Sequence, residues 1–75
     1  MKTYVLKIGE YYLYEDDVEG DVLVRDVTNA IEFNEKKKKS WDMDVLPDMK
    51  GMGIYTEDGT TVTVDSFEWV STGSL

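Results

Sequence analysis

Short segments in which apolar and polar residues alternate, separated by glycine-containing turns, run through this chain of 75 residues. In the first of them, residues 3–8, the apolar side chains fall on one face of an extended segment, because successive side chains of a strand point to opposite faces. Gly9 and Glu10 then precede the aromatic-rich residues 11–14. The alternation and the turn predict a β-hairpin at the start of the chain.

Further segments carry the same signal. Residues 22–27 are rich in β-branched side chains and predict a third strand. Residues 41–45 alternate strictly between apolar and acidic, which predicts a half-buried strand, and Pro47 disfavours helix at the residue before it. The turn signal of residues 56–59, built on Asp-Gly, predicts a second hairpin, and residues 67–70 predict a last short strand.

One segment favours a helix instead. Residues 29–40 contain Glu32 and Glu35, each placed four residues before a lysine, which is the favourable order for an ion pair on a helix surface. Asp26 or Thr28 can cap its N-terminus. The apolar residues of the segment are poorly spaced for an amphipathic helix, and this argues against the assignment.

These segments together predict a single, mainly β globular domain over residues 1–70 and a flexible tail over residues 71–75. The expected architecture is one small antiparallel sheet or an SH3-like barrel with at most one short helix, and an α+β arrangement is the alternative. A chain of this length has room for one thin core. The residues expected to be largely buried are Tyr4, Leu6, Ile8, Leu13, Val24, Phe33, Trp41, Ile54, Val62, Val64 and Trp69.

The chain contains no cysteine and no histidine. It therefore lacks disulfides, cysteine-based zinc sites and the commonest general base at neutral pH. The residues Asp42-x-Asp44 begin like a calcium-binding loop, but Leu46 and Pro47 stand where a further oxygen ligand and a glycine are required. There is also no glycine-rich phosphate loop. We therefore expect a protein that is not an enzyme and that holds no metal and no cofactor.

The formal net charge is −8, and four of the eight basic residues lie in one run, Lys36–Lys39. The rest of the chain has 16 acidic against 4 basic residues, a balance of −12. Such a field repels nucleic acid and anionic membranes and attracts basic proteins, while the alternative is that it only keeps a small protein soluble. The lysine run next to Trp41 resembles a nucleic-acid patch, but a solvated helix face balanced by Glu32 and Glu35 fits the surrounding charge better.

Acidic residues recur at alternate positions in two segments, residues 15–21 and the pair Asp42 and Asp44. If residues 15–21 were extended, their carboxylates would form one row spaced roughly 6.6 Å apart, twice the rise per residue of a strand. DNA presents one phosphate about every 3.4 Å of axis per strand, so such a row can occupy the Lys and Arg groups that a DNA-binding protein offers to phosphates. The expected partner-binding residues are Glu15, Asp16, Asp17, Glu19, Asp21, Asp42, Asp44 and Asp48.

Aromatic side chains supply a second expected contact surface. The three tyrosines of residues 11–14 cannot all point into the core from one strand, so at least one ring is expected at the surface. The thin core, the lack of disulfides and the expected strand edges also predict a homodimer. The residues expected to form the dimer or aromatic contact are Tyr12, Tyr14, Phe67 and Trp69.

The opening Tyr4-Val5-Leu6-Lys7-Ile8-Gly9-x-Tyr11-Tyr12, with Ala30-Ile31-Glu32-Phe33 after it, resembles small uncharacterised proteins encoded by phages of Gram-positive bacteria. The resemblance covers roughly the first half of the chain. Those relatives often continue with an Ala- and Glu-rich helix, whereas the lysine run, Trp41 and Pro47 follow here. The resemblance implies a phage setting, in which small acidic proteins that imitate DNA and disable host DNA-binding proteins are a known class.

One functional hypothesis combines these observations: an acidic, non-enzymatic inhibitor that imitates the charge of DNA and occupies a basic, nucleic-acid-binding host protein. The alternative is a small structural or assembly protein whose acidity only confers solubility. The N-terminal residues lack the apolar stretch of a signal peptide or a membrane span, so the expected location is the cytoplasm, that of the bacterial host if a phage encodes the chain. The two hypotheses differ in whether the carboxylates gather on one face of the fold.

Overall fold

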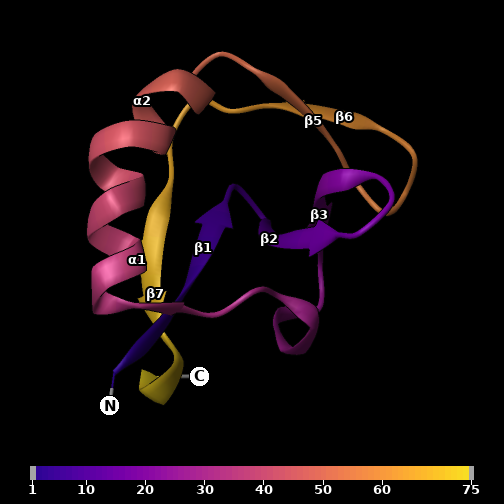
Figure 1. Cartoon of the computed structure of the whole chain (residues 1–75). Helices are drawn as coiled ribbons and strands as arrows, with labels where there is room; N and C mark the ends of the chain where they lie inside the picture. The colour runs from indigo at the N-terminus through magenta and orange to yellow at the C-terminus, as the bar shows by residue number, and fades with distance from the viewer. Residues whose placement is uncertain (1, 75) are drawn as a thin grey trace.

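Antiparallel strands are the main regular structure in the computed structural model of this chain, which describes residues 2–74 (Figure 1). The strands are β1 (Thr3–Ile8), β2 (Tyr11–Asp16), β3 (Gly20–Val24), β4 (Phe33–Asn34), β5 (Gly53–Tyr55), β6 (Thr61–Thr63) and β7 (Glu68–Ser71). The helical segments are η1 (Val27–Asn29), α1 (Glu35–Ser40), η2 (Trp41–Val45), α2 (Leu46–Met49) and η3 (Thr72–Ser74). The prediction of a mainly β fold with one helix is confirmed.

β1 is the central strand of a five-stranded antiparallel sheet. β7 pairs along one edge of β1, with Leu6 opposite Trp69. β2 and β4 share the other edge, β2 beside residues 7–8 and β4 beside residues 3–4. β3 then pairs with the outer edge of β2, so the sheet is extended by a hairpin on the side away from β7.

Both predicted hairpins are present. Gly9, with φ of 62°, is the first of the two residues that join β1 to β2, the place where a tight hairpin turn of type II′ requires a positive φ. β5 and β6 pair across residues 56–60, where Gly59 has φ of 85°. A single parallel bridge between Leu23 and Thr56 attaches this second hairpin to β3. The bridge places the β5–β6 turn beside the end of β3, although the two segments are far apart in the sequence.

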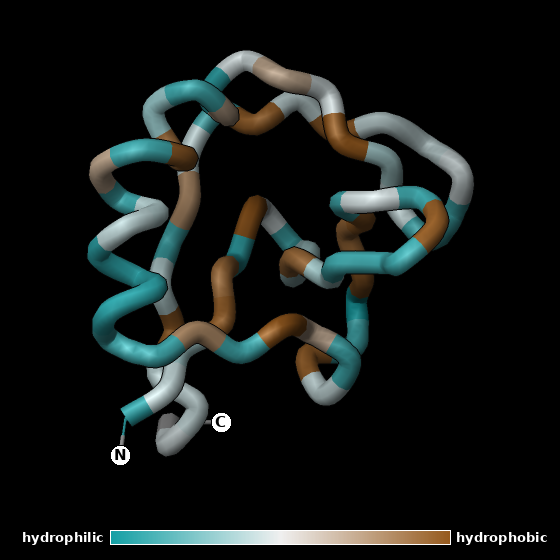
Figure 2. Tube along the Cα trace, in the orientation of Figure 1, coloured by the Kyte–Doolittle hydropathy of each residue, from teal (hydrophilic) through white to brown (hydrophobic). Residues whose placement is uncertain are grey.

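The core lies where β1, β2 and β3 meet α2 and the β5–β6 hairpin. Figure 2 shows hydrophobic stretches along β1 and hydrophilic colour along most of α1. Of the residues predicted to be in the core, the buried ones are Leu6, Ile8, Leu13, Val24, Phe33, Ile54 and Val64, and the half-buried ones are Tyr4, Trp41, Val62 and Trp69. The core also contains Leu23 from β3 and, from α2, Leu46 and Met49. Sequence reasoning missed the two α2 residues because it placed no helix there.

The helix predicted over residues 29–40 is wrong at its beginning. Residues 27–29 form a short 3₁₀ turn capped by Asp26, and Phe33 pairs with β1 as part of β4. The helix begins only at Glu35, because the Asn34 side chain accepts the N–H of Lys37 at 2.7 Å and caps that end. Because Phe33 is buried and pairs with β1, the chain is extended at this point and the helix begins only after it.

The strand predicted over residues 41–45 is also wrong, since these residues continue α1 through η2 into α2. Trp41 and Val45 are one helical turn apart and both pack against the core, so the same apolar positions fit a helical period. The Leu46 N–H bonds to the carbonyl of Trp41, five residues back. This wider turn accommodates Pro47, which has no N–H to donate and whose ring would clash with a regular α-helical turn.

The predicted boundary at residue 70 falls inside β7. Ser71, the first residue of the predicted flexible tail, pairs with Tyr4, and the Thr72 hydroxyl lies 2.6 Å from the Thr3 hydroxyl. Leu75 lies outside the described residues. Between residues 2 and 74, no helix is long and apolar enough to cross a membrane.

Candidate partner-binding surface

The acidic segment 15–21 is the tip of the β2–β3 hairpin and not an extended row. The chain reverses through Asp17–Glu19, so that Glu15 on β2 stands opposite Asp21 on β3. Directly opposed residues of an antiparallel pair have their Cβ atoms only about 4.5–5.5 Å apart. The expected single row with a regular spacing is therefore wrong, and the hairpin instead gathers its carboxylates at one end of the sheet.

Asp16 holds this hairpin tip together. Its Oδ1 accepts the N–H of Val18 at 2.8 Å and that of Glu19 at 3.1 Å. These two backbone hydrogen bonds lower the pKa of the Asp16 carboxyl group, the bond from Val18 most. The carboxylate of Asp16 is thus occupied within the turn, although sequence spacing included it among the partner-binding residues.

The lysine run is not separate from the acidic hairpin. Lys37 Nζ lies 3.8 Å from Glu15 Oε1 and 4.9 Å from the centre of the Phe33 ring. Lys38 lies 3.7 Å from Asp42 and 5.3 Å from the centre of the Tyr4 ring. Two of the four lysines therefore lie over aromatic rings that pack in or against the core, and one of them, Lys37, also faces Glu15 of the hairpin.

The glutamates expected to balance the lysine run do not do so. In the part of the chain that the structure describes, neither Glu32 nor Glu35 forms an ion pair with a lysine. Glu32 precedes the helix, while the Glu35 carboxylate accepts the hydroxyl of Tyr4. That hydrogen bond raises the pKa of Tyr4.

The other acidic residues singled out in the sequence lie on the helix. Asp42 accepts the Trp69 Nε1–H at 2.8 Å and faces Lys38, so it is engaged within the fold. Asp44 and Asp48 are exposed, one helical turn apart, and form no ion pair with residues 2–74. Among residues 2–74, no ion pair joins Asp44 or Asp48 to the hairpin tip.

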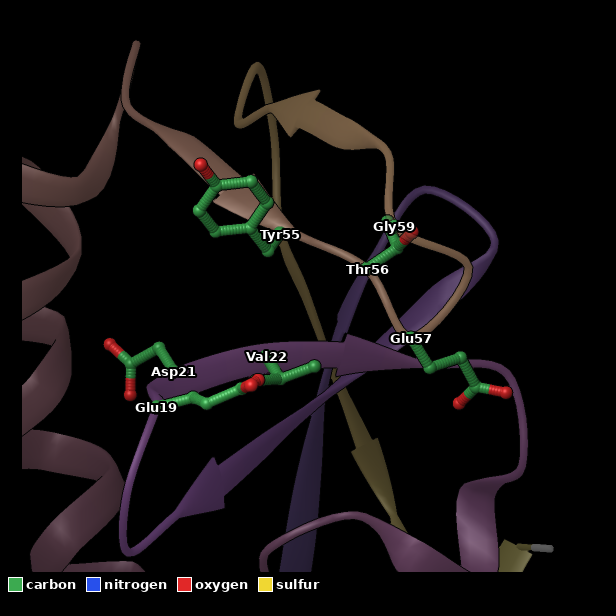
Figure 3. A pocket seen from close by; sticks show the side chains of 7 residues that line it. All are labelled: Glu19, Asp21, Val22, Tyr55, Thr56, Glu57 and Gly59. Atoms are coloured by element: carbon green, nitrogen blue, oxygen red, sulfur yellow. The ribbon is translucent and has the colours of Figure 1, made fainter.

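A cleft of about 600 Å³ lies between β3 and the β5–β6 turn (Figure 3). Its lining residues are Glu19, Asp21, Val22, Tyr55, Thr56, Glu57 and Gly59. Figure 3 shows the Tyr55 ring on one side of the cleft and Glu19 and Asp21 on the other, with Glu57 near one end. Tyr55 is 68% exposed. Sequence spacing identified the two hairpin acids but missed Tyr55 and Glu57.

Hydrogen bonds between distant segments fix the walls of the cleft. The backbone N–H of Glu57 donates to the Leu23 carbonyl at 2.9 Å, and the Glu57 carboxylate accepts the N–H of Arg25 at 3.2 Å. The buried hydroxyl of Thr56 lies 2.8 Å from that of Thr60 and closes the turn. The turn is thereby attached to the end of β3 by one main-chain hydrogen bond and by one hydrogen bond from the Arg25 N–H to the Glu57 side chain.

Arg25, the only arginine of the chain, lies outside this cleft. Its guanidinium group is 3.3 Å from Asp58, 3.7 Å from Glu10 and 3.0 Å from the Tyr11 hydroxyl, to which it donates. The hydrogen bond to Asp58 is the main reason why the pKa of Arg25 is raised. Arg25 therefore links the β1–β2 turn to the β5–β6 turn and adds no positive charge to the cleft lining.

The aromatic residues expected at a contact surface divide into two groups. Tyr12 and Tyr14 point to the same face of β2, and Tyr14 is 37% exposed. Phe67 and Trp69 instead pack against the core, Trp69 with its ring centre 4.9 Å from that of Phe33. Of the expected contact residues, Tyr14 is the one left most open.

The carboxylates of the cleft are suited to binding donor groups. Ionised Asp and Glu are acceptors only, and no group of three or more potential ligands converges on a metal position within residues 2–74. An open cleft with an aromatic wall and acidic lining complements a positively charged side chain.

Comparisons with protein-family models, curated proteins and solved structures found no match to this chain. The resemblance of its opening residues to phage proteins stays a prediction from the sequence. The geometry of the cleft and the hairpin is therefore the basis for assigning a function.

Proposed function

We propose that this chain is an acidic, non-enzymatic binding protein that occupies the nucleic-acid-binding surface of a basic partner by imitating the charge of DNA. One observation carries the proposal. The β2–β3 hairpin and the β5–β6 turn, which are far apart in the sequence, bring Glu19, Asp21 and Glu57 to one open cleft with no basic residue in its lining.

Competition is the expected mechanism. A Lys or Arg that binds a phosphate of DNA also binds a carboxylate, since both present anionic oxygen acceptors. The same group cannot serve both at once. The net charge of −8 adds long-range attraction to a basic protein and makes the association sensitive to salt.

The proposed contact surface is narrower than the set of acidic residues named from the sequence. Asp16 is occupied by the hairpin turn and Asp42 by Trp69 and Lys38. The carboxylates that stay open toward a partner at the hairpin are those of Asp17, Glu19 and Asp21. Glu57 lies toward the other end of the cleft, where its carboxylate also accepts the Arg25 N–H.

The test compares two triple variants of equal charge. The first neutralises the hairpin, as Asp17→Asn, Glu19→Gln and Asp21→Asn. The control neutralises exposed acids elsewhere, as Asp44→Asn, Asp48→Asn and Glu68→Gln. Immobilised protein is incubated with bacterial lysate at low salt, retained proteins are eluted with a salt gradient, and each is assayed for displacement of bound DNA.

The proposal expects the unaltered protein and the control variant to retain a DNA-binding protein and displace its DNA, while the hairpin variant does neither. If both variants behaved alike, the hairpin would be the wrong surface. If the unaltered protein retained no DNA-binding protein, imitation of DNA would be refuted and a structural protein made soluble by its acidity would take its place.

A further inference from the structure

The wall of the cleft contains an aromatic ring that packs little against the protein's own core. On β5, Ile54 points inward and is buried, whereas its neighbour Tyr55 points outward and is 68% exposed. The other apolar side chain of the lining, Val22 on β3, is itself buried. The ring of Tyr55 therefore forms one side of the open cleft and has a face available for a ligand (Figure 3).

The carboxylates around this ring are distributed along the cleft. In Figure 3 the Glu19 side chain runs along the side opposite Tyr55, and the carboxylates of Asp21 and Glu57 lie toward opposite ends. Across the described residues, no lysine or arginine forms an ion pair with Glu19, Asp21 or Glu57. The chain's own arginine is held by Asp58, Glu10 and Tyr11 instead.

We propose that this cleft accepts an arginine side chain of the basic partner, with the guanidinium plane against the face of Tyr55 and its N–H groups directed to the Glu19 carboxylate. The inference rests on the proposed function and specifies which residue type of the partner the cleft selects. The charge complementarity of the cleft requires a cation, and the aromatic wall decides which cation fits best.

Arginine fits this surface better than lysine for two physical reasons. Its guanidinium is planar and weakly hydrated, so it stacks on an aromatic ring while its edge still donates hydrogen bonds to a carboxylate. A lysine ammonium is a compact, strongly hydrated charge that gains less from the ring. Acidic residues alone attract arginine and lysine alike. Tighter binding of arginine than of lysine would therefore show that the ring of Tyr55 contributes to the site.

The test uses fluorescently labelled oligo-arginine and oligo-lysine peptides of equal length and charge, titrated with the full chain at low salt and followed by anisotropy. Tyr55→Leu should weaken the oligo-arginine complex by roughly two- to fivefold, the range of an exposed cation–π contact, and leave the oligo-lysine complex nearly unchanged. Tyr55→Phe keeps the ring and should keep the preference. Tyr14→Leu, at an exposed tyrosine outside the cleft lining, is the matched control and should leave both complexes unchanged.

The outcomes separate this inference from the proposed function. Equal effects of Tyr55→Leu on both peptides, or no effect on either, in a variant whose circular dichroism matches the unaltered protein, would overturn the arginine site. Loss of both peptides in the hairpin triple variant would still support charge imitation in that case. If the unaltered protein bound both peptides no better than the hairpin triple variant, the proposed function and the arginine site would fail together.

Discussion

Phe33 lies at the centre of the aromatic part of the core, and replacing it tests how that core is held together. Its ring is 0% exposed and meets those of Trp41 and Trp69 edge to face, with centres 4.8 Å and 4.9 Å away. Phe33→Leu keeps an apolar side chain but removes both ring pairs, each of which contributes about 0.5–1.5 kcal/mol. We expect the free energy of unfolding to fall by about 1–3 kcal/mol, and Tm to fall by on the order of 10 °C in a domain of this size.

Urea unfolding followed by tryptophan fluorescence is the suitable assay, because both indole rings contact Phe33. A lower midpoint at an unchanged slope would report lost stability without a change in the compactness of either state. Phe67→Leu is the control, since Phe67 packs half-buried against the core but pairs with no other ring within residues 2–74. Equal losses in the two variants would refute the role assigned to the edge-to-face contacts.

Three further predictions concern two of the turns and the response to calcium. Because two backbone N–H groups lower the pKa of Asp16, its ionised form stabilises the fold above the ordinary value of 3.8, and this contribution is lost as pH falls through the lower pKa of the folded state. Asp16→Ala should therefore lower Tm at neutral pH and change it little in acid below that window, as measured by thermal circular dichroism. Arg25→Met, which removes the guanidinium contacts to Asp58 and Tyr11, should speed amide hydrogen exchange at Gly59 and leave β1 unchanged; unaltered exchange at Gly59 would contradict the linking role of Arg25. Calcium or a chelator should leave Tm unchanged, and a shift at micromolar calcium would show a binding site.

The strands were predictable where their signals are local. The β1–β2 and β5–β6 hairpins each depend on a glycine with a positive φ between alternating residues, and both features are readable from the sequence. The helical structure of residues 41–45 was not predictable, because Trp41 and Val45 fit the period of two of a strand as well as the spacing of one helical turn. Pro47 then favoured the wrong alternative, since the π turn that accommodates it depends on the packing of the whole helix and has no sequence signature.

The candidate site was predictable as a set of residues but not as a geometry. Alternate spacing identified Glu19 and Asp21, although the chain turns back between Asp17 and Gly20 and does not extend. Tyr55 and Glu57 join them only because the end of β3 is hydrogen-bonded to the β5–β6 turn. One of these hydrogen bonds joins Arg25 to Glu57, which are 32 residues apart in the sequence. No local pattern encodes such a long-range contact, so the cleft emerges from the topology.

Repulsion among the carboxylates of the β2–β3 hairpin destabilises the free protein and favours the binding of a cation. Glu15 and Asp21 stand directly opposite each other, an arrangement of like charges that destabilises a strand pair. Lys37 offsets part of this repulsion because it faces Glu15. The same lysine lies over the ring of Phe33 in the core, which holds it in that position. Glu19 and Asp21 have no such internal counter-ion among residues 2–74. A cation supplied by a partner therefore offsets charge repulsion that the fold does not offset itself. The stabilisation by that cation is expected to be largest at the carboxylates that line the cleft beside Tyr55.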